Sequence, residues 1–161
     1  MNARAARSKT QIYLLMVFME SLAALTVLWC MIPTYRVLWA SLGQQLLELP
    51  ETPVPLVAAL VLFHCIYWYR LARVPLVMSW HSMVVSHFVL FLGRLSFICA
   101  SAFFALAIFR HLPSLIYIAD MTLLIVRVSA TFVILFSFYC YSSELERLGI
   151  ALRPAEAKGT A

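Results

Sequence analysis

The sequence predicts an all-α integral membrane protein, a four-helix bundle with both termini in the cytoplasm. Three observations lead to this fold class. Hydrophobic residues make up 64% of the 161 residues and charged residues only 12%, which is more apolar surface than a soluble domain of this length can bury. The apolar residues form four long runs, each close to or above the roughly 20 residues that cross a bilayer. Finally, the basic residues gather on one side of these runs.

The four runs predict spans at residues 11–32, 54–70, 76–110 and 114–141, within a transmembrane domain of residues 1–149. The first run ends in LWCMIPTYR, which lacks the small-residue cleavage site of a signal peptide, so we expect a permanent helix. The third run is longer than a bilayer requires, and its first part is expected at the cytoplasmic interface. The fourth helix should continue to Gly149, and residues 150–161 predict a disordered cytoplasmic tail.

The distribution of Lys and Arg predicts the orientation, because basic residues in short loops stay cytoplasmic. Basic residues precede the first span, separate the second from the third and follow the fourth, whereas the other side holds only Arg36 and Arg110. We therefore expect a multi-pass protein of the cell inner membrane with both termini inside. The formal net charge of +5 suits contact with anionic lipid headgroups, and no basic run is dense enough to indicate nucleic acid.

The loop between the first two spans predicts a short amphipathic helix in the membrane interface. Its leucines recur at near-helical spacing and the prolines that follow end the pattern. Docking of a partner helix is the alternative use of the same face. The residues concerned are Leu38, Leu42, Leu46 and Leu49, then Pro50, Pro53 and Pro55.

Several ionisable residues fall inside the predicted spans: Glu20, His64, Arg94, Asp120 and Arg127. Counted from the outer helix ends at about 1.5 Å per residue, all but Asp120 are expected roughly 15–24 Å deep, around the midplane. An unpaired charge at that depth costs at least about 2.5–3.5 kcal/mol. We therefore expect Glu20 to pair with Arg94 or Arg127, and the shallower Asp120 to pair with whichever guanidinium reaches it.

A seven-residue repeat in the third span predicts that Arg94 faces the bundle interior. His87, Arg94 and Ser101 form this repeat beside a stripe of small residues, and such stripes allow close helix packing in lipid. In the fourth span Thr131 lies one turn from Arg127. The complete predicted polar network is Glu20, His64, His87, Arg94, Ser101, Asp120, Arg127 and Thr131, and the small stripe is Ser86, Gly93, Ala100 and Ala107.

This network has three possible roles. It could fix which helices meet, form a polar path or binding site for a proton, an ion or an anionic headgroup, or contact another membrane subunit. The preferred function is a non-enzymatic accessory, assembly or scaffolding subunit whose partners are the lipid bilayer, other membrane proteins or further copies of itself. The alternative is a homo-oligomeric channel or transporter that moves a proton or small anion through Glu20, His64, Arg94 and Arg127.

Other chemistry is disfavoured by the sequence. The four cysteines are isolated and form no C-x-x-C motif, and no metal-binding or hydrolase motif occurs. A b-type haem requires histidines at matching depth, whereas His87 is expected roughly 10 Å nearer the cytoplasm than His64. A b-haem or quinone-linked subunit is therefore the least favoured interpretation, and we expect no enzyme activity, cofactor or metal site.

Overall fold

Four long helices make up the structure, a computed structural model that describes residues 3–40, 54–76, 78, 80–115 and 121–154. They are α1 (Ala3–Ala40), α2 (Val54–Arg73), α3 (Met83–Leu115) and α4 (Met121–Ala151). Each contains a segment that is long and apolar enough to cross a membrane, and no strand occurs in the described ranges. These features confirm the predicted all-α class and are compatible with a multi-pass membrane protein.

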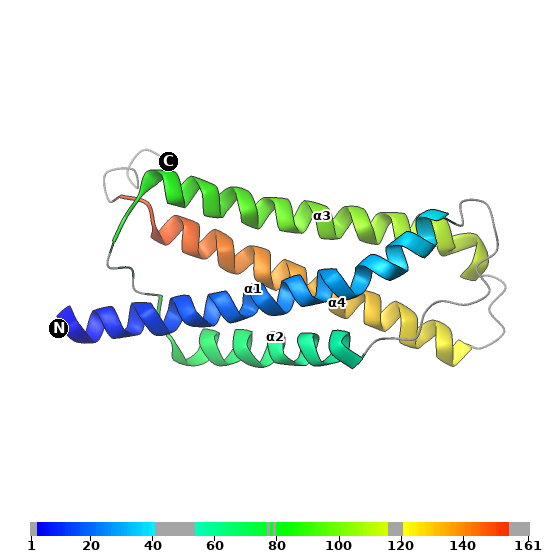
Figure 1. Cartoon of the computed structure of the whole chain (residues 1–161), viewed down its shortest axis with the longest axis horizontal. Helices are drawn as coiled ribbons and strands as arrows, with labels where there is room; N and C mark the ends of the chain where they lie inside the picture. Colours follow the sequence, from blue (N-terminus) through cyan, green and yellow to red (C-terminus); the bar gives the residue numbers. More distant parts are fainter. Residues whose placement is uncertain (1–2, 41–53, 77, 79, 116–120, 155–161) are drawn as a thin grey trace.

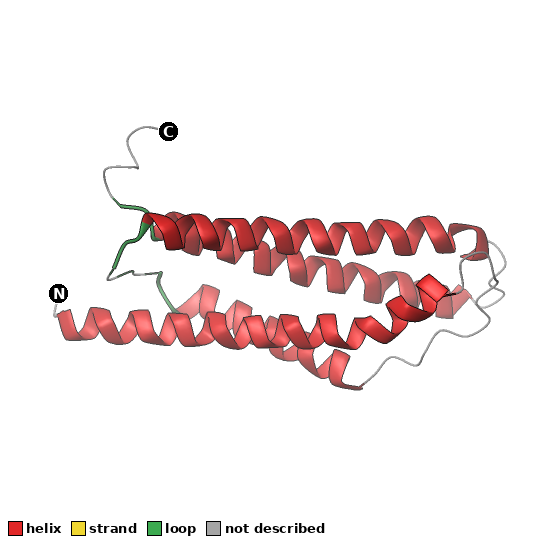
Figure 2. Cartoon of the chain, turned by 45° about the horizontal axis from the view of Figure 1, so that its top comes forward, coloured by secondary structure: helices red, strands yellow, loops and turns green. Residues whose placement is uncertain are grey.

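The helices form two closely packed pairs, α1 with α2 and α3 with α4 (Figures 1 and 2). Fewer contacts join the pairs, and they come mainly from α4, which touches both α1 and α2. The first residues of α1, the last residues of α4 and the linker between α2 and α3 all lie at one end of the bundle, called here the termini end (Figure 1).

The first helix is longer than predicted, because it continues beyond residue 32 to Ala40 and includes Pro33. A proline inside a helix removes one backbone hydrogen bond and bends the axis, and α1 changes direction toward its carboxyl end in Figure 1. Residues 38–40 of the predicted interfacial helix thus belong to α1. The rest of that predicted helix, from residue 41, lies outside the described residues.

The third helix begins at Met83 rather than at residue 76, because Ser82 caps it. The Ser82 carbonyl accepts a hydrogen bond from the Ser86 amide at 2.9 Å, and its hydroxyl accepts one from the Val85 amide at 3.5 Å. Its own amide donates to the Leu152 carbonyl at 3.0 Å, which ties the linker to the end of α4. Leu152 is 2% exposed, so the prediction of a disordered tail is wrong for residues 150–154.

Small residues on α3 form its contact with α4, as the sequence indicated. The Ser86 hydroxyl donates to the Gly149 carbonyl at 2.6 Å. A Cβ atom at Gly93 would lie 3.1 Å from the Leu145 Cβ, so the two backbones are already in close contact. The buried Ala100 extends this contact. The described members of the small stripe, Ser86, Gly93 and Ala100, therefore all face the interior.

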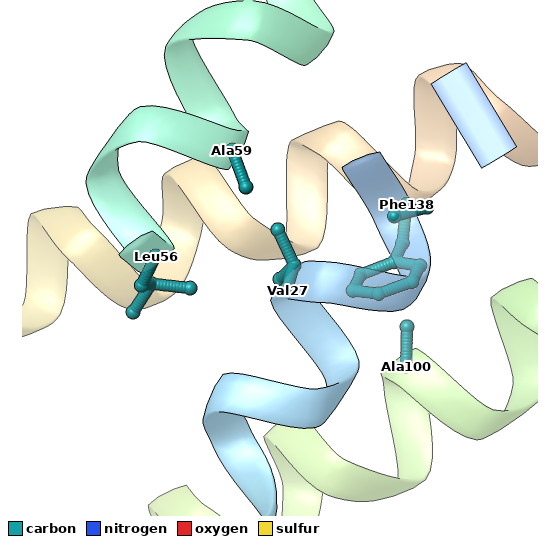
Figure 3. Packing of buried hydrophobic residues seen from close by; sticks show 6 residues of the cluster. Val27, Leu56, Ala59, Ala100 and Phe138 are labelled. Carbon is teal, nitrogen blue, oxygen red and sulfur yellow. The ribbon is translucent and has the colours of Figure 1, made fainter. Parts of the chain in front are cut away.

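One apolar cluster joins all four helices near the middle of the described bundle. Val27 from α1 and Ala59 from α2 meet Ala100 from α3 and Phe138 from α4 (Figure 3). Large apolar side chains on the outside remain exposed, for example Trp29 at 74% and Val84 at 80%. A surface of this kind is stable in hydrocarbon and not in water, in agreement with a membrane-embedded bundle.

Candidate functional site: a buried ion-pair cluster

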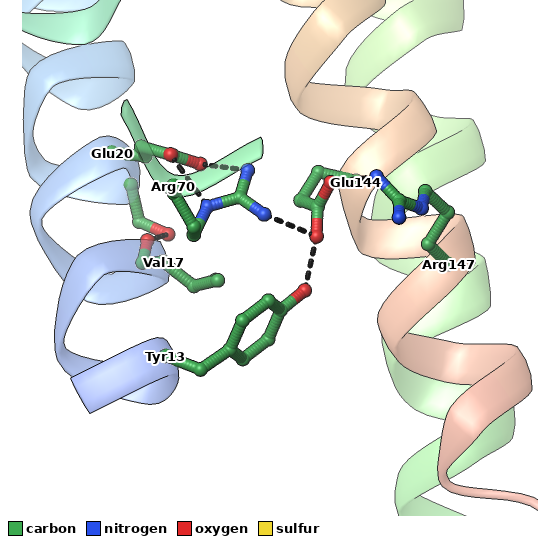
Figure 4. A network of polar contacts seen from close by, with 7 residues as sticks. Tyr13, Val17, Glu20, Arg70, Glu144 and Arg147 are labelled. Atoms are coloured by element: carbon green, nitrogen blue, oxygen red, sulfur yellow. Dashed lines mark hydrogen bonds and ion pairs between the residues drawn. The ribbon is translucent and has the colours of Figure 1, made fainter. Parts of the chain in front are cut away.

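Three buried charged side chains from three different helices meet near the termini end of the bundle. We call Glu20 of α1, Arg70 of α2 and Glu144 of α4 the charged cluster; each residue is at most 1% exposed (Figure 4). The Arg70 guanidinium binds Glu20 in a bidentate manner, with Nε–Oε1 at 2.8 Å and Nη2–Oε2 at 3.0 Å. Its third nitrogen, Nη1, forms an ion pair with Oε1 of Glu144. One guanidinium thereby connects both helix pairs.

The surroundings of the cluster satisfy its remaining polar atoms. The Tyr13 hydroxyl donates a hydrogen bond to Glu144, and Arg147 Nη1 lies 3.3 Å from the other carboxylate oxygen of that residue. The guanidinium carbon of Arg70 lies 5.2 Å from the ring centroid of Tyr13 and 5.6 Å from that of Tyr67, within cation–π range. Two carboxylates are thus matched by two guanidiniums, although the Arg147 side chain is 52% exposed.

Helical periodicity explains why these charges point inward. Glu20 follows the buried Tyr13 by seven residues, and Arg70 follows the buried Phe63 by seven and Tyr67 by three. Residues at these spacings share one helix face. Arg70 was missed at the sequence level because its position near the end of the second span suggested a cytoplasmic orientation signal. Arg70 shares a helix face with Phe63 and Tyr67, and this spacing indicates a position in the core.

Further polar contacts follow α4 away from the cluster. Ser21 and Tyr141 share a hydrogen bond of 2.9 Å between their hydroxyls, and Ser137 Oγ lies 3.0 Å from Nε2 of His64. Beside Ser137 there is a void of about 10 Å³, which is room for roughly one water molecule. The side chain of His64, predicted to belong to the polar network, therefore has a defined hydrogen-bond partner on α4.

The predicted pairing of Glu20 with Arg94 is wrong, because its carboxylate binds Arg70. Arg94 is exposed on the outside of α3, and so is His87. Arg94 directly follows the buried Gly93, and His87 directly follows the buried Ser86. Successive residues of a helix point about 100° apart, so both side chains are turned away from the interior. The prediction that the Arg94 face points inward is therefore wrong, and the neighbouring small stripe takes that place. Ser101 is only partly buried.

The predicted common depth of Arg94 and Arg127 is also wrong. Gly93 packs against Ser142 and Leu145, so Arg94 is level with the charged cluster near the termini end. The backbone of Arg127 is 15 residues before Ser142 in α4, which corresponds to about 22 Å along the helix. Asp120 and the Arg127 side chain lie outside the described residues. Thr131 is partly buried.

The described residues contain no group of three His, Cys, Asp or Glu side chains close enough to hold a metal ion. The cysteines are all free thiols, and only Cys140 is buried. The described contacts of the site are ion pairs and hydrogen bonds between helices. Neither a protein-family model nor a curated protein nor a solved structure matches the chain.

Proposed function

We propose that the protein is an accessory, assembly or scaffolding subunit of the cell inner membrane, which acts through lateral contacts between helices. The closed geometry of the charged cluster carries this proposal. Both carboxylates and the central guanidinium bind one another and the Tyr13 hydroxyl. In this cluster the charged groups bind one another and join three helices, which is the arrangement expected of a structural contact.

The orientation in this proposal has both termini in the cytoplasm. Exposed Lys9, Arg73 and Arg147 lie at the termini end, while Arg36 is near the opposite end of α1. Basic residues flanking spans favour the cytoplasmic side. The charged cluster then lies toward the cytoplasmic side of the bundle, with Glu20 about 16 Å along α1 from Lys9.

The outer face of α3 is the surface that we assign to a partner. It carries His87 and Arg94, seven residues apart and both exposed, among apolar side chains such as Phe91. Within the described residues Arg94 has no carboxylate in ion-pair contact. A guanidinium at a lipid-facing position is stabilised by an acidic residue on a neighbouring helix. The proposed partner is therefore a transmembrane helix with an Asp or Glu level with Arg94.

Purification from native membranes in a mild detergent tests this function. The wild-type protein should carry a stoichiometric membrane companion, and Arg94→Gln should lose it while keeping the same helix content and elution volume. Arg36→Gln is the matched control, because it removes an exposed guanidinium from the other end of the bundle. Equal retention of the companion by both variants would reject the α3 face, and a wild-type protein without any companion would reject the subunit role.

Reconstitution into liposomes tests the alternative of a channel or transporter. We expect no proton or chloride flux above that of empty liposomes. Flux through the wild-type protein that disappears in a folded Glu20→Gln variant would replace the scaffolding proposal with transport. Glu20 is the appropriate position because its carboxylate belongs to the central ion pair.

A further inference from the structure

An apolar groove runs between α1 and α2 on the outside of the bundle. Its volume is about 380 Å³, within the roughly 300–1,000 Å³ of small-molecule sites. Two methionines contribute flexible side chains that adapt to an irregular hydrocarbon ligand. The groove-lining residues are Leu15, Met16, Met19, Cys65, Ile66 and Tyr69.

Two cationic residues lie beyond the groove lining, toward the termini end. Lys9 precedes Met16 by seven residues, and Arg73 follows Tyr69 by four, so each shares a helix face with the groove lining. Because α1 and α2 run antiparallel, both residues lie at the same end of the groove (Figure 1). Both are exposed, and neither forms an ion pair with a described carboxylate.

We propose that this groove binds an anionic phospholipid of the leaflet at the termini end. One acyl chain lies along the methionines, and the phosphate lies between Lys9 and Arg73. Basic pockets between transmembrane helices are suited to anionic headgroups, and an aromatic residue such as Tyr69 is favoured at headgroup level. The hydrocarbon and the charge of one lipid molecule therefore match the two chemically different parts of the site.

A second copy of the chain fits the same surface less well. In a symmetric dimer whose two copies have the same orientation in the membrane, the two-fold axis lies along the bilayer normal, so each copy presents the same patch at the same depth. The Lys9 and Arg73 residues of the two copies would then face one another, and like charges repel. Charge complementarity thus favours a lipid phosphate over self-association at this groove.

Native mass spectrometry of the protein in detergent micelles tests the proposal. The protein is mixed with equimolar phosphatidylglycerol and phosphatidylcholine that have identical acyl chains. Each basic residue near a headgroup strengthens binding of an anionic lipid by about fivefold, so phosphatidylglycerol should be retained about 5- to 25-fold better. The Lys9→Gln/Arg73→Gln variant should bind the two lipids about equally. Arg36→Gln removes an exposed charge from the opposite end of α1 and should keep the preference.

A second pair of variants tests the groove itself. Cys65→Phe fills the groove and should reduce retention of both lipids, while Cys99→Phe, at an exposed thiol on α3, should leave it unchanged. Equal loss of preference in both charge variants would show general charge attraction and overturn the proposal. Unchanged retention of both lipids by Cys65→Phe would also overturn the proposal. A protein dimer that Cys65→Phe dissociates would assign the groove to a second copy instead.

Discussion

Removal of the Arg70 guanidinium should destabilise the bundle by at least about 3 kcal/mol. The side chain is 1% exposed and makes contacts of 2.8 and 3.0 Å to Glu20 as well as an ion pair with Glu144. Arg70→Gln breaks these contacts and leaves two carboxylates buried near each other without their shared cation. Breaking one buried ion pair typically costs about 3–5 kcal/mol, and here one substitution breaks two.

Titration with SDS in mixed micelles, followed by tryptophan fluorescence, measures this free energy of unfolding. Arg73→Gln is the matched control, because it removes an exposed arginine three residues farther along α2 and should leave the midpoint unchanged. The triple variant Glu20→Leu/Arg70→Leu/Glu144→Leu should recover most of the loss, since apolar residues replace a buried charge network at little or no cost.

Two results would refute this reasoning. One is a loss below about 1 kcal/mol in Arg70→Gln, the size expected of a solvent-exposed ion pair. The other is a triple variant that is no more stable than the single one. Either result would mean that water or lipid headgroups already solvate the carboxylates, and that the cluster is less buried than its 0–1% exposed fractions indicate.

Three further variants test other contacts with the same titration. Gly149→Ala should cost about 1–3 kcal/mol, because the new Cβ would lie 2.6 Å from Leu90 Cγ; Leu90→Ala in the same chain should offset part of this loss. Tyr13→Phe removes the hydrogen bond to Glu144 and should cost about 1.5–3 kcal/mol, and an unchanged midpoint would contradict the structural role of this bond. Arg94→Gln should leave the midpoint unchanged, and a loss as large as that of Arg70→Gln would contradict its exposed position.

The helical class could be predicted from the sequence because hydropathy depends on composition within each run. A stretch such as Val54–Arg73, with 20 residues and mean hydropathy 1.6, has few stable alternatives to a membrane helix. Helix ends were harder to predict. The start of α3 depends on the Ser82 cap and on its bond to the Leu152 carbonyl, a contact between residues 70 positions apart.

The charged cluster could be predicted only in part. Glu20 was recognised as a buried residue that needs a cation, but its partner depends on how neighbouring helices are aligned. A seven-residue repeat identifies two adjacent faces of α3 equally well, one with Gly93 and one with Arg94. The choice between them is made by the close contact of Gly93 with α4, which no pattern within α3 reveals.

The division of the ion pairs between the two helix pairs has a consequence for biogenesis. Glu20 and Arg70 neutralise each other within α1 and α2, while Glu144 and Arg147 do so within α4, three residues apart. The buried carboxylates of Glu20 and Glu144 therefore each have a cation within their own half of the chain. Only the contacts of Glu144 with Arg70 and Tyr13 must wait until both halves are inserted. This arrangement is suited to insertion of each helix pair with its buried carboxylate already paired, followed by association of the two pairs within the membrane.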